Sequence, residues 1–213
     1  KIPSSSYTGN TLTYSVEASL DENMENVKIN RKNTVTGYLK SNYQLLALYA
    51  TPWVDNDKMR FDPKYKELSE KPSKGSKAKI EEEKRKEEEM KKERSDKQSE
   101  EFKEMLTDEF DIVSFDAFSL EEDGRYDETP DLIYNETFTV KNMINKAGKN
   151  YILDVGKLIG KQLELDETEK KRDNDIFINF AKTFSNKISV TIPAGYTVDG
   201  LSELNSTLDN ESA

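Results

Sequence analysis

The stretch LTYSVEASL, residues 12–20, decides the fold class, because apolar and polar side chains alternate through it without a break. The apolar positions are Leu12, Tyr14, Val16, Ala18 and Leu20. A period of two with one polar face predicts a half-buried antiparallel strand. After the turn DENMEN, the segment VKINRKNTVTGYL repeats the alternation through Val27, Ile29 and Val35 and ends at Gly37. The two segments together predict a hairpin or meander pair.

The same alternation returns in the second half of the chain. It is present in FDIVSFDAFSL, in DLIYNETFTV, in NYILDVG, and in a segment marked by Phe184, Ile188, Val190 and Ile192. Strands and helices do not alternate in β-α-β order. We therefore predict a mainly β fold of the α+β class, an antiparallel β-sandwich with an inserted helical segment that includes one long charged helix. Residues 1–213 are predicted to form one β-sandwich domain, with residues 39–108 as a helical and linker insertion within it.

The insertion begins with a helical stripe and continues into a polar connection. The stripe is formed by Leu39, Tyr43, Leu46, Ala47 and Ala50, and we expect Pro52 to end it. The connection that follows is predicted to hold a short helical turn at residues 64–68. Trp53, the only tryptophan of the chain, is interpreted as a core or edge anchor of this connection.

The most highly charged segment is KIEEEKRKEEEMKKERSDKQSEEFKEML, residues 79–106. Its acids precede bases at four-residue spacing, as at Glu82 and Lys86, and each such pair stabilises a helix by about 0.2–0.5 kcal/mol. Apolar residues are too sparse for a coiled coil. At its end, Phe102, Met105 and Leu106 form an apolar stripe, which predicts that this end docks on the sheet while residues 81–92 are exposed.

Composition excludes several classes of function. The formal net charge is -10, which argues against a nucleic-acid partner, because such binding depends on basic residues that displace phosphate counterions. The chain has no cysteine and no histidine, so it lacks a thiol nucleophile and the commonest general base. It has no apolar run long enough to span a membrane. The start at KIPSSSYTGN, without Met or an apolar signal core, is interpreted as that of a piece of a longer protein.

The carboxylates suggest metal sites only at first sight. Asp55, Asp57 and Asp62 lie close together in sequence, as do Asp173 and Asp175, but neither group has the glycine and terminal glutamate of a helix-flanked calcium loop. We interpret them as solvated loop acids and predict no catalytic residue, no metal and no cofactor. Lys170, Lys171 and Arg172 form a basic group after Gly156 and Gly160, for which a solvated turn is favoured over an anion site.

The segment from residue 151 to residue 205 resembles a known family. It contains LIGKQ, then KKR before a strand, and above all IPAGYTVDGL, where Pro193, Gly195 and Tyr196 are predicted to form a structural turn. In these features, and in TVTGYLK near the N-terminus, the chain resembles β-rich domains of unknown function that accompany transglutaminase-like cores in bacterial envelope proteins.

The resemblance implies a non-catalytic accessory or interaction module of a larger secreted or periplasmic protein of a Gram-negative bacterium. In such proteins the catalytic Cys, His and Asp belong to the core, so the chain is expected not to be an enzyme. The expected partner is a neighbouring domain of the same polypeptide or an envelope protein.

Two alternatives stay open at this point. One is a glycan-binding or carboxylate-dependent glycan-acting domain, which would need two facing acids in a cleft lined by aromatic residues. The other makes the charged helix an arm that docks a partner.

Overall fold

The computed structural model describes residues 6–64, 77–160, 167–171, 179–205 and 207. Its strands are β1 (Thr11–Leu20), β2 (Asn26–Val35), β3 (Ile112–Asp123), β4 (Leu132–Lys141), β5 (Ile144–Ala147), β6 (Asn150–Leu153) and β7 (Thr183–Thr191). Its α-helices are α1 (Lys40–Ala47), α2 (Trp53–Phe61), α4 (Lys77–Thr107) and α5 (Glu167–Lys170). Short 3-10 helices are η1 (Tyr7–Gly9), η2 (Gly37–Leu39), η3 (Val155–Ile159) and η4 (Leu201–Leu204). The predicted α+β class, with a sheet-rich core and an inserted long charged helix, is confirmed.

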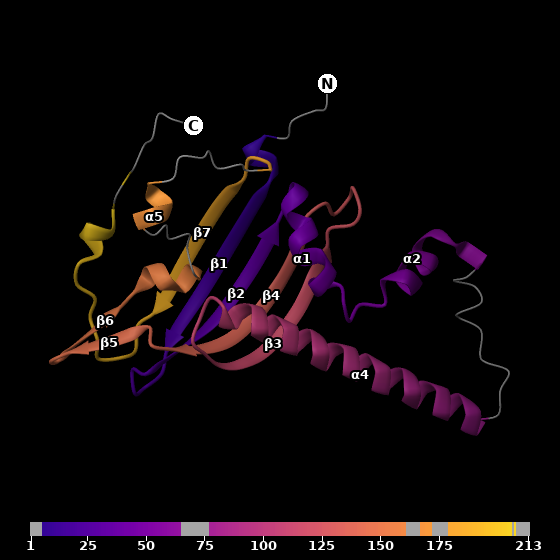
Figure 1. The fold of residues 1–213 in the computed structure, drawn as a ribbon. Helices are drawn as coiled ribbons and strands as arrows, with labels where there is room; N and C mark the ends of the chain where they lie inside the picture. Colours follow the sequence, from indigo (N-terminus) through magenta and orange to yellow (C-terminus); the bar gives the residue numbers. More distant parts are fainter. Residues whose placement is uncertain (1–5, 65–76, 161–166, 172–178, 206, 208–213) are drawn as a thin grey trace.

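Five strands form the principal sheet, in the order β3-β4-β2-β1-β7, and β5 pairs with β6 in a second, small sheet (Figure 1). The β1–β2 hairpin is antiparallel, and so are the pairs β2–β4 and β3–β4. β7 differs, because it runs parallel to β1. The main-chain N–H of Thr183 donates to the carbonyl of Asn10 over 2.9 Å, which places the start of β7 beside the start of β1. The principal sheet is therefore mixed.

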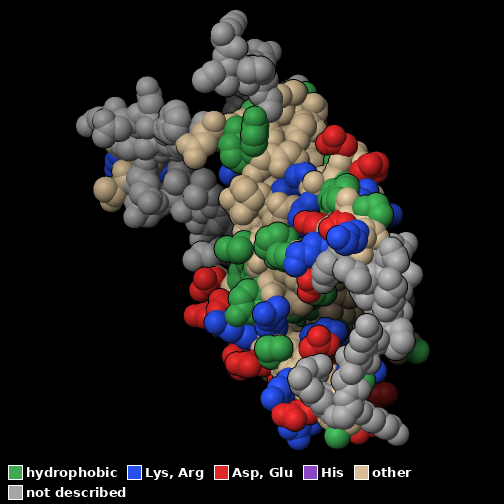
Figure 2. Space-filling model, turned by 90° about the vertical axis from the view of Figure 1, so that its right-hand side faces the viewer, with side chains coloured by type: hydrophobic (Ala, Val, Ile, Leu, Met, Phe, Trp, Pro, Cys, Tyr) green, Lys and Arg blue, Asp and Glu red, His purple; other side chains and the backbone are tan. Residues whose placement is uncertain are grey.

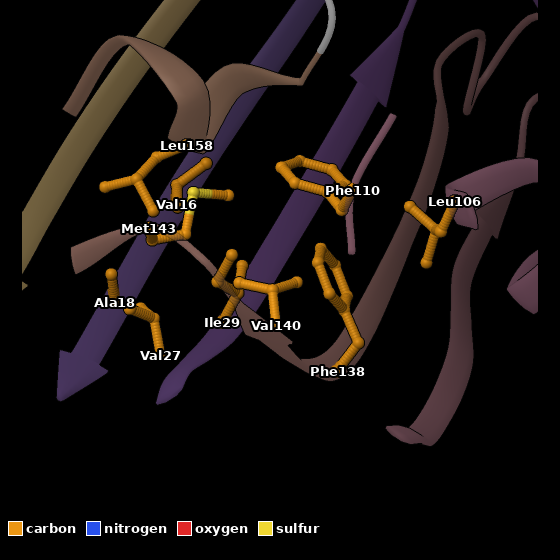
Figure 3. Packing of buried hydrophobic residues seen from close by; sticks show 10 residues of the cluster. All are labelled: Val16, Ala18, Val27, Ile29, Leu106, Phe110, Phe138, Val140, Met143 and Leu158. Atoms are coloured by element: carbon orange, nitrogen blue, oxygen red, sulfur yellow. The ribbon is translucent and has the colours of Figure 1, made fainter. Parts of the chain in front are cut away.

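One face of the principal sheet is buried and the other is polar. The buried face is supplied by alternate residues of the central strands, among them Leu12, Val16, Ala18, Val27, Ile29, Val35, Leu132, Tyr134, Phe138 and Val140. The layer over this face consists of α1, the C-terminal end of α4, the β5–β6 hairpin and η3. In Figure 3, Met143 and Leu158 lie over Val16, while Phe110 lies beside Phe138. The second layer is thus built mostly from helices and a short hairpin, not from a large second sheet.

Helix α4 divides into an exposed part and a docked part. Residues 84–97 are all exposed, whereas Phe102 and Leu106 are buried and Met105 is half-buried. The side-chain amide of Gln98 donates to the carbonyls of Leu46 and Ala47 over 2.8 and 2.9 Å, which joins α4 to the end of α1. The exposed ion pair of Glu82 and Lys86 closes at 2.8 Å. Figure 1 shows the helix leaving the sheet and extending away from it.

Helix α2 occupies a segment that the sequence pattern predicts as a connection. Pro52 is its N-cap residue, and the helix carries Asp55 in its first turn and Lys58 and Arg60 in its last. Those charges oppose the helix dipole at each end and stabilise the helix. The turn predicted at residues 64–68 lies outside the described residues except for Lys64.

The region after β4 also differs from the pattern. The pattern predicts NYILDVG as one strand, but β6 ends at Leu153 and the chain turns into η3. β5 has no clear alternation of its own, and β6 pairs with it along its whole length. No helix among the described residues has both the length and the apolar character needed to cross a membrane.

Candidate functional site

A buried ionic cluster lies in the centre of the principal sheet. Arg31 of β2 and Glu136 of β4 stand directly opposite each other in the antiparallel register, on a face that is mostly apolar. The Arg31 Nε donates to Glu136 Oε2 over 3.0 Å, and the Asn33 side-chain amide donates to the same oxygen over 2.8 Å. The side chains of Arg31 and Glu136 are 1% and 0% exposed. The cluster is therefore sealed from solvent at its centre.

A second carboxylate joins this cluster at its rim. Glu109 follows the end of α4, and its Oε2 accepts from Arg31 Nη1 over 3.2 Å. Gly160 packs against Glu109: a Cβ at this position would come within 2.5 Å of Glu109 Oε2. The glycine also has a φ of 82°, which side chains rarely tolerate. The positive φ therefore favours glycine at the point where η3 ends beside Glu109.

Aromatic rings surround the guanidinium of Arg31. Its Cζ lies 4.6 Å from the centroid of the Tyr14 ring, at the distance of a cation–π contact. Burial on its own would lower the pKa of Arg31, but the charge of Glu136, with Tyr14 and Glu109, raises it above the ordinary value. Burial also raises the pKa of Tyr14 and that of Tyr134 well above the usual range. Arg31 thus stays charged and the tyrosines neutral, and the contacts of Arg31 link β1, β2 and β4 to Glu109, which follows the end of α4.

The second polar cluster fastens α2 to the loop between β3 and β4. Arg125 Nη1 contacts Asp57 Oδ2 at 2.8 Å, and its Nη2 contacts Asp123 Oδ2 at 2.9 Å. The Tyr126 hydroxyl donates to the other oxygen of Asp57. Arg60 adds an exposed ion pair with Glu128 at 3.2 Å. We call the contacts among Asp57, Asp123, Arg125 and Tyr126 the α2 latch.

Outside the latch, α2 presents apolar side chains to solvent. Trp53, Val54, Met59 and Phe61 are 46%, 45%, 47% and 64% exposed. Asp57 is the one residue of this helix that is not exposed. Tyr38, Leu45 and Tyr49, in the segment just before α2, are exposed as well. From the side toward which α2 and α4 project, Figure 2 shows hydrophobic side chains in small groups between basic and acidic ones.

The α2 latch is expected to open in acid. Hydrogen bonds from Tyr126 and Arg125 hold the pKa of Asp57 below its ordinary value. A carboxylate whose pKa is lower in the docked state than in the undocked state stabilises docking at every pH above the undocked pKa. This stabilisation is lost as the pH falls through the pKa of the docked carboxylate. Quenching of Trp53 fluorescence by acrylamide is therefore expected to stay constant down to about pH 4 and to rise below it.

Two variants test this prediction. Asp57→Ala is expected to show increased quenching already at neutral pH, because it removes the acceptor for Arg125 and Tyr126. Asn56→Ala, an exposed position in the same helix but outside the latch, is the matched control and should behave as the wild type. Equal quenching of Trp53 in both variants and the wild type would show that the latch does not hold α2.

A third polar region is a hollow at one end of the principal sheet, with a volume of about 480 Å³. The β1–β2 turn, the connection from β4 to β5, and the β5–β6 hairpin line it. Its polar side chains include Asn26, Lys141, Asn142, Lys146 and Tyr151. We call it the tip hollow.

The residues singled out from the sequence lie in several different places. Phe102, Met105 and Leu106 pack into the core from α4. Pro193, Gly195 and Tyr196 form a turn in which the Tyr196 N–H points to the Pro193 carbonyl over 3.3 Å, with Gly195 at a φ of 89°. Trp53, interpreted as a core or edge anchor, is half-exposed at the start of α2, with its ring centroid 5.7 Å from Arg125 Cζ.

The acids and bases singled out from the sequence are dispersed in the same way. Asp57 belongs to the α2 latch, and Asp55 faces Lys58 at 3.7 Å. Lys170 pairs with Glu167 at 2.8 Å. Asp173, Asp175 and Arg172 lie outside the described residues. Within the described part of the chain, no three acids come together as a metal site.

Sequence reasoning missed the ionic cluster, although a signal for it exists. The alternation of β2 passes from Ile29 to Val35 through Arg31 and Asn33, and that of β4 passes from Tyr134 to Phe138 through Glu136. Polar residues at core positions of two strands indicate a buried pair. The pattern does not show that these strands are neighbours, because 105 positions separate the two charged residues.

Comparison with known proteins adds no relative. No protein-family model matches the chain, and the searches of curated proteins and of solved structures give no match either. The resemblance to transglutaminase-associated domains therefore stays a prediction.

Proposed function

We propose that this chain is a non-catalytic interaction module that packs on a neighbouring domain of a larger transglutaminase-like, secreted or periplasmic bacterial protein. The observation that carries the proposal is the orientation of α2. This helix is held to the body of the molecule by the α2 latch, by the Arg60–Glu128 ion pair and by an edge contact of Phe61 with the Tyr126 ring, while its apolar side chains stay about half exposed or more. The extracytoplasmic context and the neighbouring core rest on the sequence resemblance.

The orientation of α2 is the reverse of that of an ordinary surface helix. A surface helix usually buries an apolar stripe against the core and solvates its charges. Full burial of one such side chain contributes about 1.5–3 kcal/mol. Covering four side chains that are about half exposed would therefore contribute on the order of 4 kcal/mol to a contact. A set of exposed apolar side chains on a helix that polar contacts fix in place is typical of a protein interface.

The ionic cluster supports an accessory role over glycan hydrolysis. Among the described residues, Glu109 and Glu136 are two acids that share Arg31 and lie near aromatic rings, as the two acids of a glycoside hydrolase would. Glu136, however, is fully buried and bound by Arg31 and Asn33. A polysaccharide cannot reach Glu136, which supports a structural rather than a catalytic role for this pair.

Hydrogen exchange tests the proposed contact. In the full-length gene product, backbone amides of α2 are expected to exchange at least about tenfold more slowly than in the 213-residue chain, because docking suppresses local opening. Residues 84–94 of α4 serve as an internal reference and should exchange equally in both. The purified chain is expected to hydrolyse neither peptides, esters nor glycans.

A pair of variants assigns the slower exchange to the apolar side chains. Val54→Asp is expected to restore fast exchange of α2 in the full-length protein, whereas Asn56→Asp adds the same charge without removing an apolar group and should retain the protection. Equal hydrogen-exchange rates of the α2 amides in the chain and in the full-length protein would contradict the proposal. So would a hydrolytic activity of the chain that one acidic substitution abolishes.

A further inference from the structure

The tip hollow is lined by more basic than acidic side chains, and the carboxylates of Asp21 and Asp111 bind two of its asparagines. The chain carries a formal net charge of -10, yet Lys141 and Lys146 both line the hollow, against one acid, Glu25. Neither lysine forms an ion pair with any described residue. Lys146 Nζ instead lies 5.8 Å from the centroid of the Tyr151 ring. Two ammonium groups that form no ion pair with a described residue favour the binding of an anion at the hollow.

The hollow also presents fixed hydrogen-bond acceptors. The Asn26 amide nitrogen donates to Asp21 Oδ2 over 2.9 Å, and the Asn142 amide nitrogen donates to Asp111 Oδ2 over 2.9 Å. Each carboxylate therefore fixes the orientation of one amide, so that its oxygen is the group left to accept a bond from a ligand. With the carboxylate of Glu25, these oxygens suit a ligand that brings several hydrogen-bond donors.

The backbone around the hollow is held in unusual conformations. Met24 and Asn142, with φ values of 59° and 62°, are the non-glycine residues with positive φ in the described part of the chain, and both line the hollow. Such conformations cost about 1–3 kcal/mol each and persist only where the surroundings impose them. Asp21 imposes the first, since its side chain accepts from the main-chain N–H of Glu25 over 2.8 Å. The lining groups are thus held in place without a ligand.

We propose that the tip hollow binds a carboxylate-bearing sugar unit of a polysaccharide. The ligand carboxylate contacts Lys141 and Lys146, and its hydroxyl groups donate to the oxygens of Asn26, Asn142 and Glu25. The half-buried Tyr151 and Ile144 contact its C–H groups. A phosphate ion would satisfy the lysines but would leave most of the acceptors without donors. The volume lies within the usual range for small-ligand sites of about 300–1,000 Å³, and the proposal does not depend on docking through α2.

Titration of the complete chain with three probes tests this site. A galacturonic acid trisaccharide is expected to bind saturably and to shift the NMR signals of residues 23–26 and 141–146. Maltotriose, which has hydroxyl groups but no carboxylate, is expected to bind at least about tenfold more weakly. Triglutamate, which has carboxylates but no hydroxyl groups, is expected to be weaker as well. Binding of the acidic sugar should weaken as salt is added.

Charge-matched double variants locate the binding. Lys141→Gln with Lys146→Gln is expected to reduce the affinity for the galacturonic acid trisaccharide at least about tenfold. Lys28→Gln with Lys187→Gln removes the same charge from exposed strand positions outside the hollow and should change the affinity less than about twofold. All these residues are exposed, so both variants should fold.

Four results would overturn the proposal. They are no saturable binding of the acidic sugar, equal binding of maltotriose, tighter binding of triglutamate, and equal loss of affinity in the two double variants. Tighter binding of triglutamate would assign the hollow to an acidic peptide instead.

Discussion

Replacing Arg31 with methionine is expected to lower the free energy of unfolding by about 3–5 kcal/mol, the usual cost of removing one partner of a buried ion pair. Arg31 supplies the Nε donor to Glu136, and no solvent reaches that carboxylate. After the substitution, the buried carboxylate of Glu136 would keep Asn33 as its hydrogen-bond donor but would have no positive charge beside it. Glu109 would lose its bond to Arg31 as well, but it is partly exposed and can be hydrated.

A second substitution should recover at least half of this loss. In Arg31→Met combined with Glu136→Gln, no charge stays buried at the pair. The oxygen of the introduced glutamine can still accept from Asn33, and its amide can donate to Asn33 Oδ1. In the wild type, Asn33 Oδ1 and Glu136 Oε1 are the two buried side-chain oxygens without a hydrogen-bond partner in the described part of the chain, so a new donor at position 136 can satisfy Asn33 Oδ1. Removing an unpaired charge while adding a donor favours the double variant over the single one.

Urea unfolding followed by circular dichroism measures both effects. Lys28→Met, on the exposed face of the same strand, is the matched control and should lie within about 0.5 kcal/mol of the wild type. A loss below about 1 kcal/mol for Arg31→Met, or a double variant less stable than the single one, would contradict the view that the cluster holds the sheet together.

The strands that sequence predicts best are those with one face in contact with water. β1 alternates through its full length because its outer residues are solvated while Val16 and Ala18 are buried. The same reasoning locates β4. β7 shows the limit of predicting strands from alternation. The pattern locates this strand, but its parallel pairing with β1 depends on the path of the chain over the sheet. Local periodicity contains no information on that path.

Tertiary contacts explain what the local pattern could not predict. α2 is short and turns no apolar stripe to the core, so its sequence resembles a linker, and its position depends on Arg125 and Tyr126, almost seventy residues away. The ionic cluster depends likewise on Arg31 meeting Glu136, and the tip hollow on three connections that meet at one end of the sheet. The end of α4 is different, because Phe102 and Leu106 stand one turn apart in an otherwise charged helix. A stripe of this kind indicates a docking face without knowledge of the partner strand.

Phe102→Ala should have a similarly large effect, a loss of about 3–5 kcal/mol in the free energy of unfolding. The Phe102 ring is fully buried and stacks on that of Phe118, with centroids 4.5 Å apart. It also lies 5.8 Å from the Tyr134 ring. Truncation would leave a cavity between α4 and the sheet, at the point where the helix makes most of its apolar contact.

Met90→Ala is the matched control on the same helix, since Met90 is 52% exposed in the projecting part and should cost less than about 0.5 kcal/mol. Both variants are compared by urea unfolding at one pH. Unequal losses would place the cooperative core at the C-terminal end of α4 and leave the charged part as a solvated extension. A loss below about 1 kcal/mol for Phe102→Ala would instead mean that α4 docks through the Gln98 contacts to α1, and that the apolar stripe of this helix contributes little to folding.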